Sequence, residues 1–351
     1  MDIWPRAADG QDMTPRRDIL ITALKAAGLA ATAPLLSAAA PYVRLDSERD
    51  TLHGERRRLS AEVESLYEQQ GRVPADALQV AICAAWANLD RYPKSKRVAV
   101  HDLRAKVATI AGSNSITLAD PANGGRWFEL AHRYARLAGE PSLISLAHAR
   151  SANAAMYWKA CLRQARTDIE LARRHADTAE LRALAAGEEC RVRILYGDTS
   201  GALRAAEEAV AFASTSDHSD RIDRCTVGFA HMTVSRALAR LPHMGSAAEE
   251  HAAEALRTLP RTADLLRAHA HLDIAEARLR SRDIDGALST ADRMLRGCER
   301  LEPVLRARLG ELATLIERRT GRRCDEIRRH GESRPAACEG SGGGPLGGGG
   351  A

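Results

Sequence analysis

The feature that most limits how this 351-residue chain can fold is a pair of small or apolar residues, seven positions apart, that recurs along its second half. Seven residues are about two turns of an α-helix, so both members of a pair lie on one helix face. Two helices approach closely only where the side chains between them are short. The pairs are Ala165 and Ala172, Ala202 and Ala209, Ala248 and Ala255, and Ala287 and Met294.

These pairs predict a repeated unit of two helices. Their leading residues are separated by 37, 46 and 39 positions, close to the ~34-residue period of tetratricopeptide repeats with small insertions. A single unit cannot bury its apolar stripe, so several units must stack. We call the first helix of a unit A and the second, which carries the pair, B. The sequence therefore predicts an all-α fold, a right-handed superhelical solenoid of tetratricopeptide-like helical hairpins.

Turn and capping residues indicate where the helices of each unit begin and end. We expect Asp177 with Glu180 to form a capping box at the start of one A helix, and Thr262 to cap another. The ends of three A helices are expected at Tyr196-Gly197-Asp198, Leu241-Pro242 and Arg282-Asp283.

The regular spacing divides the chain into four segments. Residues 1–45 are an N-terminal segment with an apolar helix, 46–141 an irregular helical region, 142–320 the repeats, and 321–351 a disordered Arg- then Gly-rich tail. In the irregular region we expect helices over 47–70, 74–92, 98–110 and 126–137. Breaks are expected at Gly112-Ser113-Asn114 and over residues 120–125.

Composition restricts the class of protein. Hydrophobic residues make up 45% and charged residues 28% of the chain, as in folded globular proteins. Nearly all of the basic residues are arginines, a bias typical of a GC-rich genome. The formal charge of +5 is small and both signs are interspersed, whereas a DNA-binding surface clusters its basic residues. Direct DNA binding is therefore not expected.

The seven cysteines occur singly and form no CxxC pair. An odd number of widely spaced cysteines argues against a zinc site and against a disulfide framework. Reduced thiols fit the cytoplasm best. The cysteines are Cys83, Cys161, Cys190, Cys225, Cys298, Cys324 and Cys338.

The N-terminal segment admits two interpretations. Arg16-Arg17, an apolar run over 21–40 and an alanine triplet at 38–40 resemble a twin-arginine export signal. Pro41 is a poor residue after a cleavage site, and the charged and turn-forming residues inside the run argue against a transmembrane helix. The alternative is an Ala/Leu-rich helix that docks on the following bundle. We expect the protein in the cytoplasm, with export by the twin-arginine route as the alternative.

Three stretches resemble a known family, the actinobacterial tetratricopeptide regulators, in which a helix-turn-helix DNA-binding domain commonly precedes the solenoid. The resemblance implies a regulatory protein-protein interaction scaffold linked to transcriptional or developmental control. It implies a protein or peptide partner on the concave face of the solenoid. This sequence contains no recognition-helix pattern ahead of the repeats. The resembling stretches are Ala165–Glu180 (ARTDIELARRHADTAE), Leu195–Val210 (LYGDTSGALRAAEEAV) and Asp283–Leu295 (DIDGALSTADRML).

No catalytic or cofactor motif is present, so we expect neither an enzyme nor a cofactor-binding protein. HExxH, GxSxG and nucleotide-binding loops are missing from the sequence. His269 and His271 are two positions apart on a helix and point to different faces, so they cannot chelate a metal together. Polar positions on the A helices are the candidates for a partner-binding groove. They are Arg182, Glu189, Arg193, Arg224, His231, Arg267 and His271.

Overall fold

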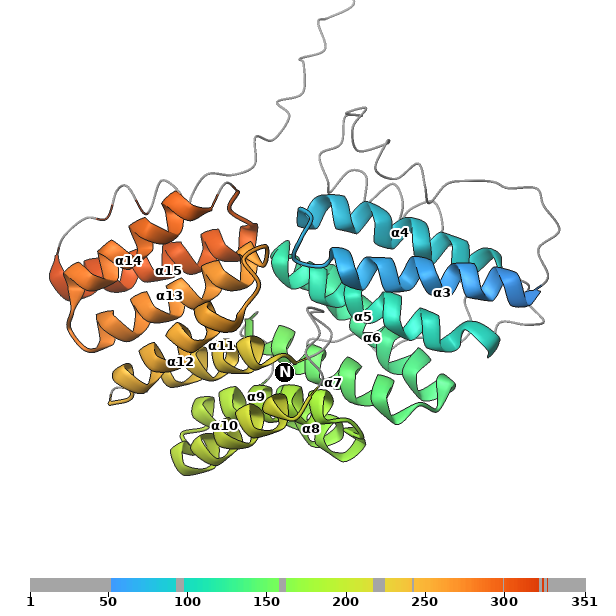
Figure 1. Cartoon of the computed structure of the whole chain (residues 1–351), viewed down its shortest axis with the longest axis horizontal. Helices are drawn as coiled ribbons and strands as arrows, with labels where there is room; N and C mark the ends of the chain where they lie inside the picture. The colour runs from blue at the N-terminus through green and yellow to red at the C-terminus, as the bar shows by residue number, and fades with distance from the viewer. Residues whose placement is uncertain are drawn as a thin grey trace, which may run out of the picture.

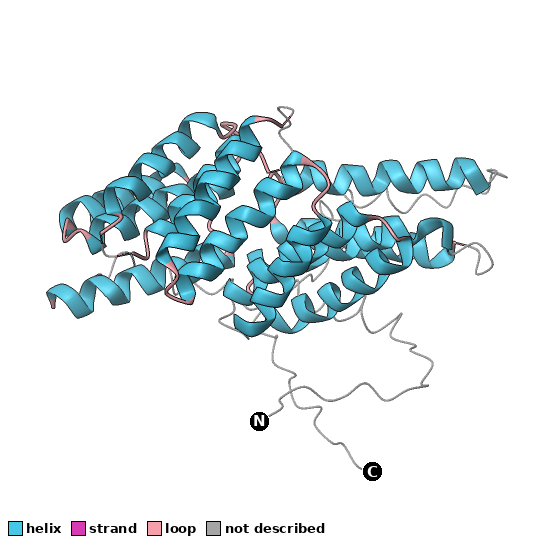
Figure 2. Ribbon diagram, turned by 90° about the horizontal axis from the view of Figure 1, so that it is seen from below, coloured by secondary structure: helices cyan, strands magenta, loops and turns pink. Residues whose placement is uncertain are grey.

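The computed structural model describes residues 52–92, 98–157, 162–216, 225–241, 243–298 and 300–321, together with residues 324 and 327. In this part of the chain there are thirteen α-helices and no β-strand (Figures 1 and 2). The predicted all-α class is confirmed. The helices are α3 (Leu52–Gln69), α4 (Ala75–Arg91), α5 (His101–Thr117), α6 (Pro121–Ala138), α7 (Pro141–Tyr157), α8 (Leu162–His175), α9 (Ala179–Leu195), α10 (Thr199–Ser214), α11 (Val227–Leu238), α12 (Gly245–Thr258), α13 (Asp264–Arg280), α14 (Ile284–Gly297) and α15 (Pro303–Thr320).

Consecutive helices pack in pairs, as a helical repeat requires. The five pairs from α5–α6 to α13–α14 have their most extensive contacts within the pair. The first helix of each pair also packs on the first helix of the next, from α5 through α7, α9, α11 and α13 to α15. Each unit thus buries its apolar stripe against its neighbours, as stacked repeats do.

The recurring pairs of small residues lie where they were predicted, on the B helices α8, α10, α12 and α14. All seven alanines are fully buried, and Met294 is 2% exposed. These short side chains let each B helix pack closely against its neighbours.

The stack of hairpins follows an arc whose two ends meet (Figure 1). Helix α15 touches α5, and Arg300, just before α15, forms an ion pair of 3.0 Å with Asp76 at the start of α4. The amide of Ala75 donates a hydrogen bond of 3.4 Å to Glu302 Oε1. The first helices of the pairs therefore surround a central space.

The first expected break before the repeats is wrong, and the second is misplaced, because only residues 118–120 separate the two helices there. Gly112, Ser113 and Asn114 lie inside α5, where the Phe128 ring packs so closely that a Cβ on Gly112 would be 2.7 Å from it. The Asn114 amide donates to the Ala75 carbonyl at 2.8 Å. Residues that favour turns in isolation are held in this helix by tertiary contacts. Likewise, α6 begins at Pro121, because proline suits the first helical turn and Asp120 caps it by accepting from the Asn123 amide at 3.1 Å.

Two expected caps differ by one residue. The cap of α9 is Thr178 rather than Asp177, with its hydroxyl accepting from the Leu181 amide at 3.3 Å. Helix α13 follows Ala263 without a side-chain cap, and Thr262 lies in the preceding turn. The predicted turn after α9 is confirmed, because the helix ends at Leu195 and Gly197 has a positive φ of 77°.

The N-terminal segment, with its twin-arginine-like pattern, lies outside the described residues, as do Cys161, Cys338 and residues 328–351. None of the helices described combines the length and apolar character needed to cross a bilayer. The five described cysteines, Cys83, Cys190, Cys225, Cys298 and Cys324, form no disulfide with one another, and all but Cys298 are buried.

Candidate functional site

A cavity of about 230 Å³ occupies the centre of the arc. Its wall is formed mainly by the first helices of the pairs, α5, α7, α9, α11 and α13, together with the start of α15 and the turn between α3 and α4. Clefts of this kind, with apolar walls and a few placed polar groups, are typical of ligand sites. The apolar part of the wall includes Ile116, Phe229, Met232, Leu266 and Leu305.

The charged side chains of the wall are mainly arginines. Five arginines line the cavity against three carboxylates. Burial raises the pKa of one of these carboxyls, Glu302. Two of these arginines, Arg236 and Arg300, also pair with Asp273 and Asp76, which lie outside the wall; guanidinium N–H groups of this kind are suited to binding a carboxylate or phosphate. The residues are Arg72, Arg150, Arg191, Arg236 and Arg300, and Glu188, Asp264 and Glu302.

Arg236 is the best-placed anion donor. It is 5% exposed; its Nε donates to Asp273 Oδ1 at 3.3 Å and its Nη1 to the Tyr157 hydroxyl. Its Nη2 has no hydrogen-bond partner within the described part of the chain. A buried guanidinium with an unused N–H is a ready donor for a carboxylate or phosphate.

Two neighbours complete this polar centre. Arg191 donates from Nη1 to Asn153 Oδ1 at 2.8 Å and to Glu188 Oε2 at 2.7 Å. Glu188 is fully buried, and its Oε1 lacks a partner among the described residues. Two residues of the wall therefore each carry one buried polar atom without a partner among the described residues. Burial, followed by the charges of Arg236, Arg308 and Arg191, lowers the pKa of the lining residue His269 well below its ordinary value.

The candidate groove residues predicted on α9 do not line this cavity. Glu189 forms ion pairs with Arg173 on α8 at 3.2 Å and with Arg193 at 2.7 Å. Arg193 also pairs with Asp198, the cap of α10. Arg182 is exposed and donates to the Ala176 carbonyl at 3.3 Å. The structure brings Glu189 and Arg193 together, beside the B helices.

The remaining candidates lie elsewhere along the stack. His231 Nδ1 is 2.8 Å from Nδ1 of His251 on α12, and Arg267 donates to the Leu256 carbonyl at 2.7 Å. His271 is partly buried, and burial and then Arg267 lower its pKa. None of these three lines the cavity, and Arg224 lies outside the described residues. Their role in partner binding stays a prediction.

Three residues that line the cavity lie one or two positions away from the residues that the sequence predicted. Glu188, Arg191 and His269 line it, whereas the sequence favoured Glu189, Arg193 and His271. The first helices pack on several sides, and ten residues of α9 are buried. No single polar face is therefore visible in the sequence. A charged residue inside a stretch of alanines, such as Glu188 after Ala183–Gly187, is the only signal.

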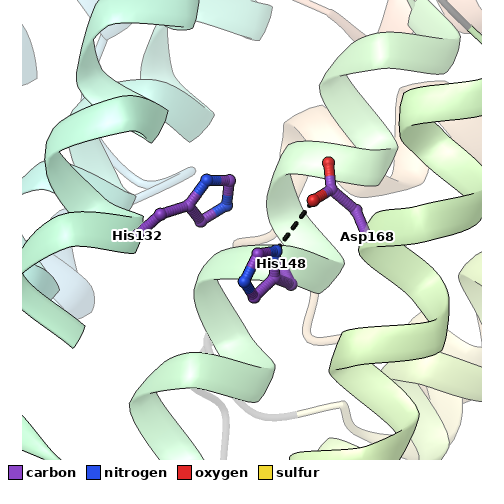
Figure 3. A group of neighbouring side chains, drawn as sticks. All are labelled: His132, His148 and Asp168. Carbon is purple, nitrogen blue, oxygen red and sulfur yellow. Dashed lines mark hydrogen bonds and ion pairs between the residues drawn. The ribbon is translucent and has the colours of Figure 1, made fainter. Parts of the chain in front are cut away.

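A second cluster lies where α6, α7 and α8 meet (Figure 3). His148 Nδ1 is 2.7 Å from Asp168 Oδ1, and Asp168 also accepts from Ser151 at 2.9 Å and Gln164 at 3.2 Å. The ring of His132 stacks on that of His148, with centroids 4.0 Å apart and planes 17° apart. Asp168 is fully buried, so its charge depends on these donors.

His132 is the least satisfied member of the cluster. Its Nε2 is buried without a hydrogen-bond partner in the described ranges. Burial, and then the neighbouring His148, lowers the pKa of His132 to about 4. One atom from each of His132, His148 and Asp168 lies within 4.8 Å of the others. Sequence spacing gave no sign of this cluster, because its members come from three helices.

No protein-family model, no curated protein and no solved structure significantly matches this chain.

Proposed function

We propose that this protein is a regulatory binding protein whose central cavity holds a segment of a peptide or protein partner. The arc of hairpins is, on this proposal, a tetratricopeptide-like right-handed superhelix, and the cavity is on its concave side. The resemblance of the repeats to actinobacterial tetratricopeptide regulators supports a role in transcriptional or developmental control.

The cavity lined by arginines carries this proposal. Its volume of about 230 Å³ suits a few residues of a chain rather than a whole folded surface. Rotation of the Arg236 and Glu188 side chains would turn their buried, unused Nη2 and Oε1 atoms toward a segment that offers both a carboxylate and a backbone N–H. Phe229, Met232 and Leu305 match an apolar side chain next to that carboxylate.

Binding of short peptides tests the proposal. A library with apolar C-terminal residues is screened by fluorescence anisotropy, and each ligand found is compared with its C-terminally amidated form. Arg236→Lys keeps the charge beside Asp273 but loses the planar fork of the guanidinium. Since hydrogen bonds to charged groups contribute about 1.5–3 kcal/mol, the variant should bind at least about tenfold more weakly.

Arg296→Lys is the matched control, because Arg296 is exposed, pairs with Asp292 at 2.6 Å and does not line the cavity. It should bind as the unchanged protein does. Equal affinity of the Arg236 variant and the unchanged protein would overturn the assignment of the cavity. If no peptide in the library binds, the proposal of a peptide-binding cavity fails.

A further inference from the structure

We propose that His132, His148 and Asp168 form a binding site for a divalent first-row metal ion, Zn²⁺ by preference, that ties α6, α7 and α8 together. The three side chains come from three successive helices and face one another (Figure 3). The proposal is independent of the central cavity, since none of the three residues lines it.

The donor set fits zinc. Imidazole nitrogen and carboxylate oxygen are ordinary Zn²⁺ ligands, and Mg²⁺ and Ca²⁺ prefer oxygen alone. The three donor atoms lie within 4.8 Å of one another, while ligand atoms around a tetrahedral Zn²⁺ are roughly 3.4 Å apart. The widest side of the site therefore has to contract by up to about 1.4 Å, and the 2.7 Å between His148 Nδ1 and Asp168 Oδ1 has to widen by roughly 0.7 Å. Three protein ligands leave a fourth position for water.

His132 is the group that an ion would satisfy. Its Nε2 is buried and has no partner among the described residues, and a buried polar atom without a partner is rare in folded proteins. The ring now stacks nearly parallel to that of His148, so it must turn about its Cβ–Cγ bond for the two lone pairs to converge. His132 is only partly buried and is followed by the exposed Arg133, which leaves room for that turn and a path for the ion.

His148 and Asp168 are already oriented as ligands. The ion would replace the proton between His148 Nδ1 and Asp168 Oδ1, which are 2.7 Å apart, and the imidazole would then carry its proton on Nε2. Ser151 donates to the other carboxylate oxygen of Asp168 at 2.9 Å. Such hydrogen bonds to a ligating carboxylate fix its orientation and are usual around bound metals.

Metal uptake by the full chain tests the proposal. The affinity tag is removed, the protein is stripped with EDTA, and Co²⁺ is added as a spectroscopic probe. We expect one ion per chain with the intense visible bands of a tetrahedral site, displacement by Zn²⁺, and a higher Tm with Zn²⁺. A sulfur-to-cobalt charge-transfer band would assign the ion to cysteine and overturn the proposal, as would a lack of uptake.

Variants locate the ion. His132→Gln removes one ligand whose Nε2 makes no hydrogen bond to the described residues, so the variant should fold and lose affinity for Zn²⁺ by at least about tenfold. Asp168→Asn removes a second ligand and should independently lower the affinity for Zn²⁺. His231→Gln is the matched control, since it changes the other histidine pair and should leave uptake unchanged. Uptake by the His132 variant equal to that of the unchanged protein would exclude this site.

Discussion

Arg300 and Asp76 form an ion pair of 3.0 Å although 224 residues separate them in the chain. The pair joins the residue ahead of α15 to the first turn of α4, so it closes the arc of hairpins. Its side chains are 51% and 34% exposed. Exposed ion pairs are screened by water, and most contribute little to stability.

We expect a double-mutant cycle of Asp76→Ala and Arg300→Ala to give a coupling energy of about 0.2–1 kcal/mol. The unfolding free energies of the four proteins in urea supply the measurement. The coupling should shrink in 1 M salt, where the Debye length is about 3 Å. A coupling of several kcal/mol would mean that the closure depends on this pair far more than its exposure indicates.

The buried alanines of the B helices should not accept larger side chains. Ala209 on α10 is fully buried, so we expect Ala209→Leu to lower the free energy of unfolding by about 1–3 kcal/mol through overpacking. Ala211 lies on the same helix and is exposed, and Ala211→Leu should be close to neutral. Thermal or urea unfolding of both variants measures the two changes in stability. Equal effects would show that the seam of small residues is not tightly packed.

The contact between Gly112 and Phe128 should make a glycine essential inside α5. A Cβ on Gly112 would lie 2.7 Å from Cζ of Phe128, whose buried ring cannot swing away. We expect Gly112→Ala to destabilise the protein by about 1–3 kcal/mol, despite the better helix propensity of alanine.

The control for Gly112 is Gly310 within α15, where an added Cβ would meet nothing within 4 Å. Gly310→Ala should stabilise the protein by about 0.5–1 kcal/mol. The free energies of unfolding of both variants are measured by urea denaturation. If Gly112→Ala proved stabilising as well, α5 and α6 would have to be farther apart than the structure places them.

Acidification should weaken the protein through His231 and His251, whose Nδ1 atoms are 2.8 Å apart. Burial lowers the pKa of both rings; His251 lowers that of His231 further, while Glu254 and Glu250 oppose the shifts. The unfolded chain, with a histidine pKa of about 6.5, therefore binds protons before the folded protein does. The stabilising contribution of the two neutral rings should be fully present above that pH. The free energy of unfolding should fall as the pH drops below it.

Urea unfolding between pH 7.5 and 5, in the presence of EDTA, measures this dependence. His251→Gln removes one of the two titrating rings, and its stability should change less with pH than that of the unchanged protein. His132, His269 and His271, whose pKa values burial also lowers, remain in both proteins and account for the residual slope. Parallel curves for the two proteins would contradict the prediction.

The sequence predicted the parts of the fold that repeat. Ala202 and Ala209 recur in equivalent form in other B helices, so their burial could be inferred from spacing alone. Gly112 and residues 121–125 were misjudged, because their local preference for turns is overridden by the contact with Phe128 and by the start of α6, which Asp120 caps. Local propensity is a weak signal wherever a tertiary contact opposes it.

The candidate sites were beyond prediction for a different reason. Arg236, Tyr157 and Glu188 meet in the cavity only because the arc brings α7, α9 and α11 together. His132 and Asp168 come from different helices and have no chelating spacing in the sequence. A constellation built by tertiary packing leaves no local pattern. Three of the predicted polar residues, Glu189, His231 and Arg267, instead contact residues of the B helices α8 and α12.

Because the buried alanines lie on the B helices, the residues that stabilise the fold and the residues that line the cavity are largely different. The seam accepts almost no change, since larger side chains overfill it and glycine weakens the helix. The cavity wall is carried mainly by other helices, the first of each pair. Descendants of such a chain can therefore exchange the polar residues that meet a ligand while the scaffold stays constant. Changes in specificity and changes in stability should then accumulate at different positions, which makes an architecture of this kind easy to diversify.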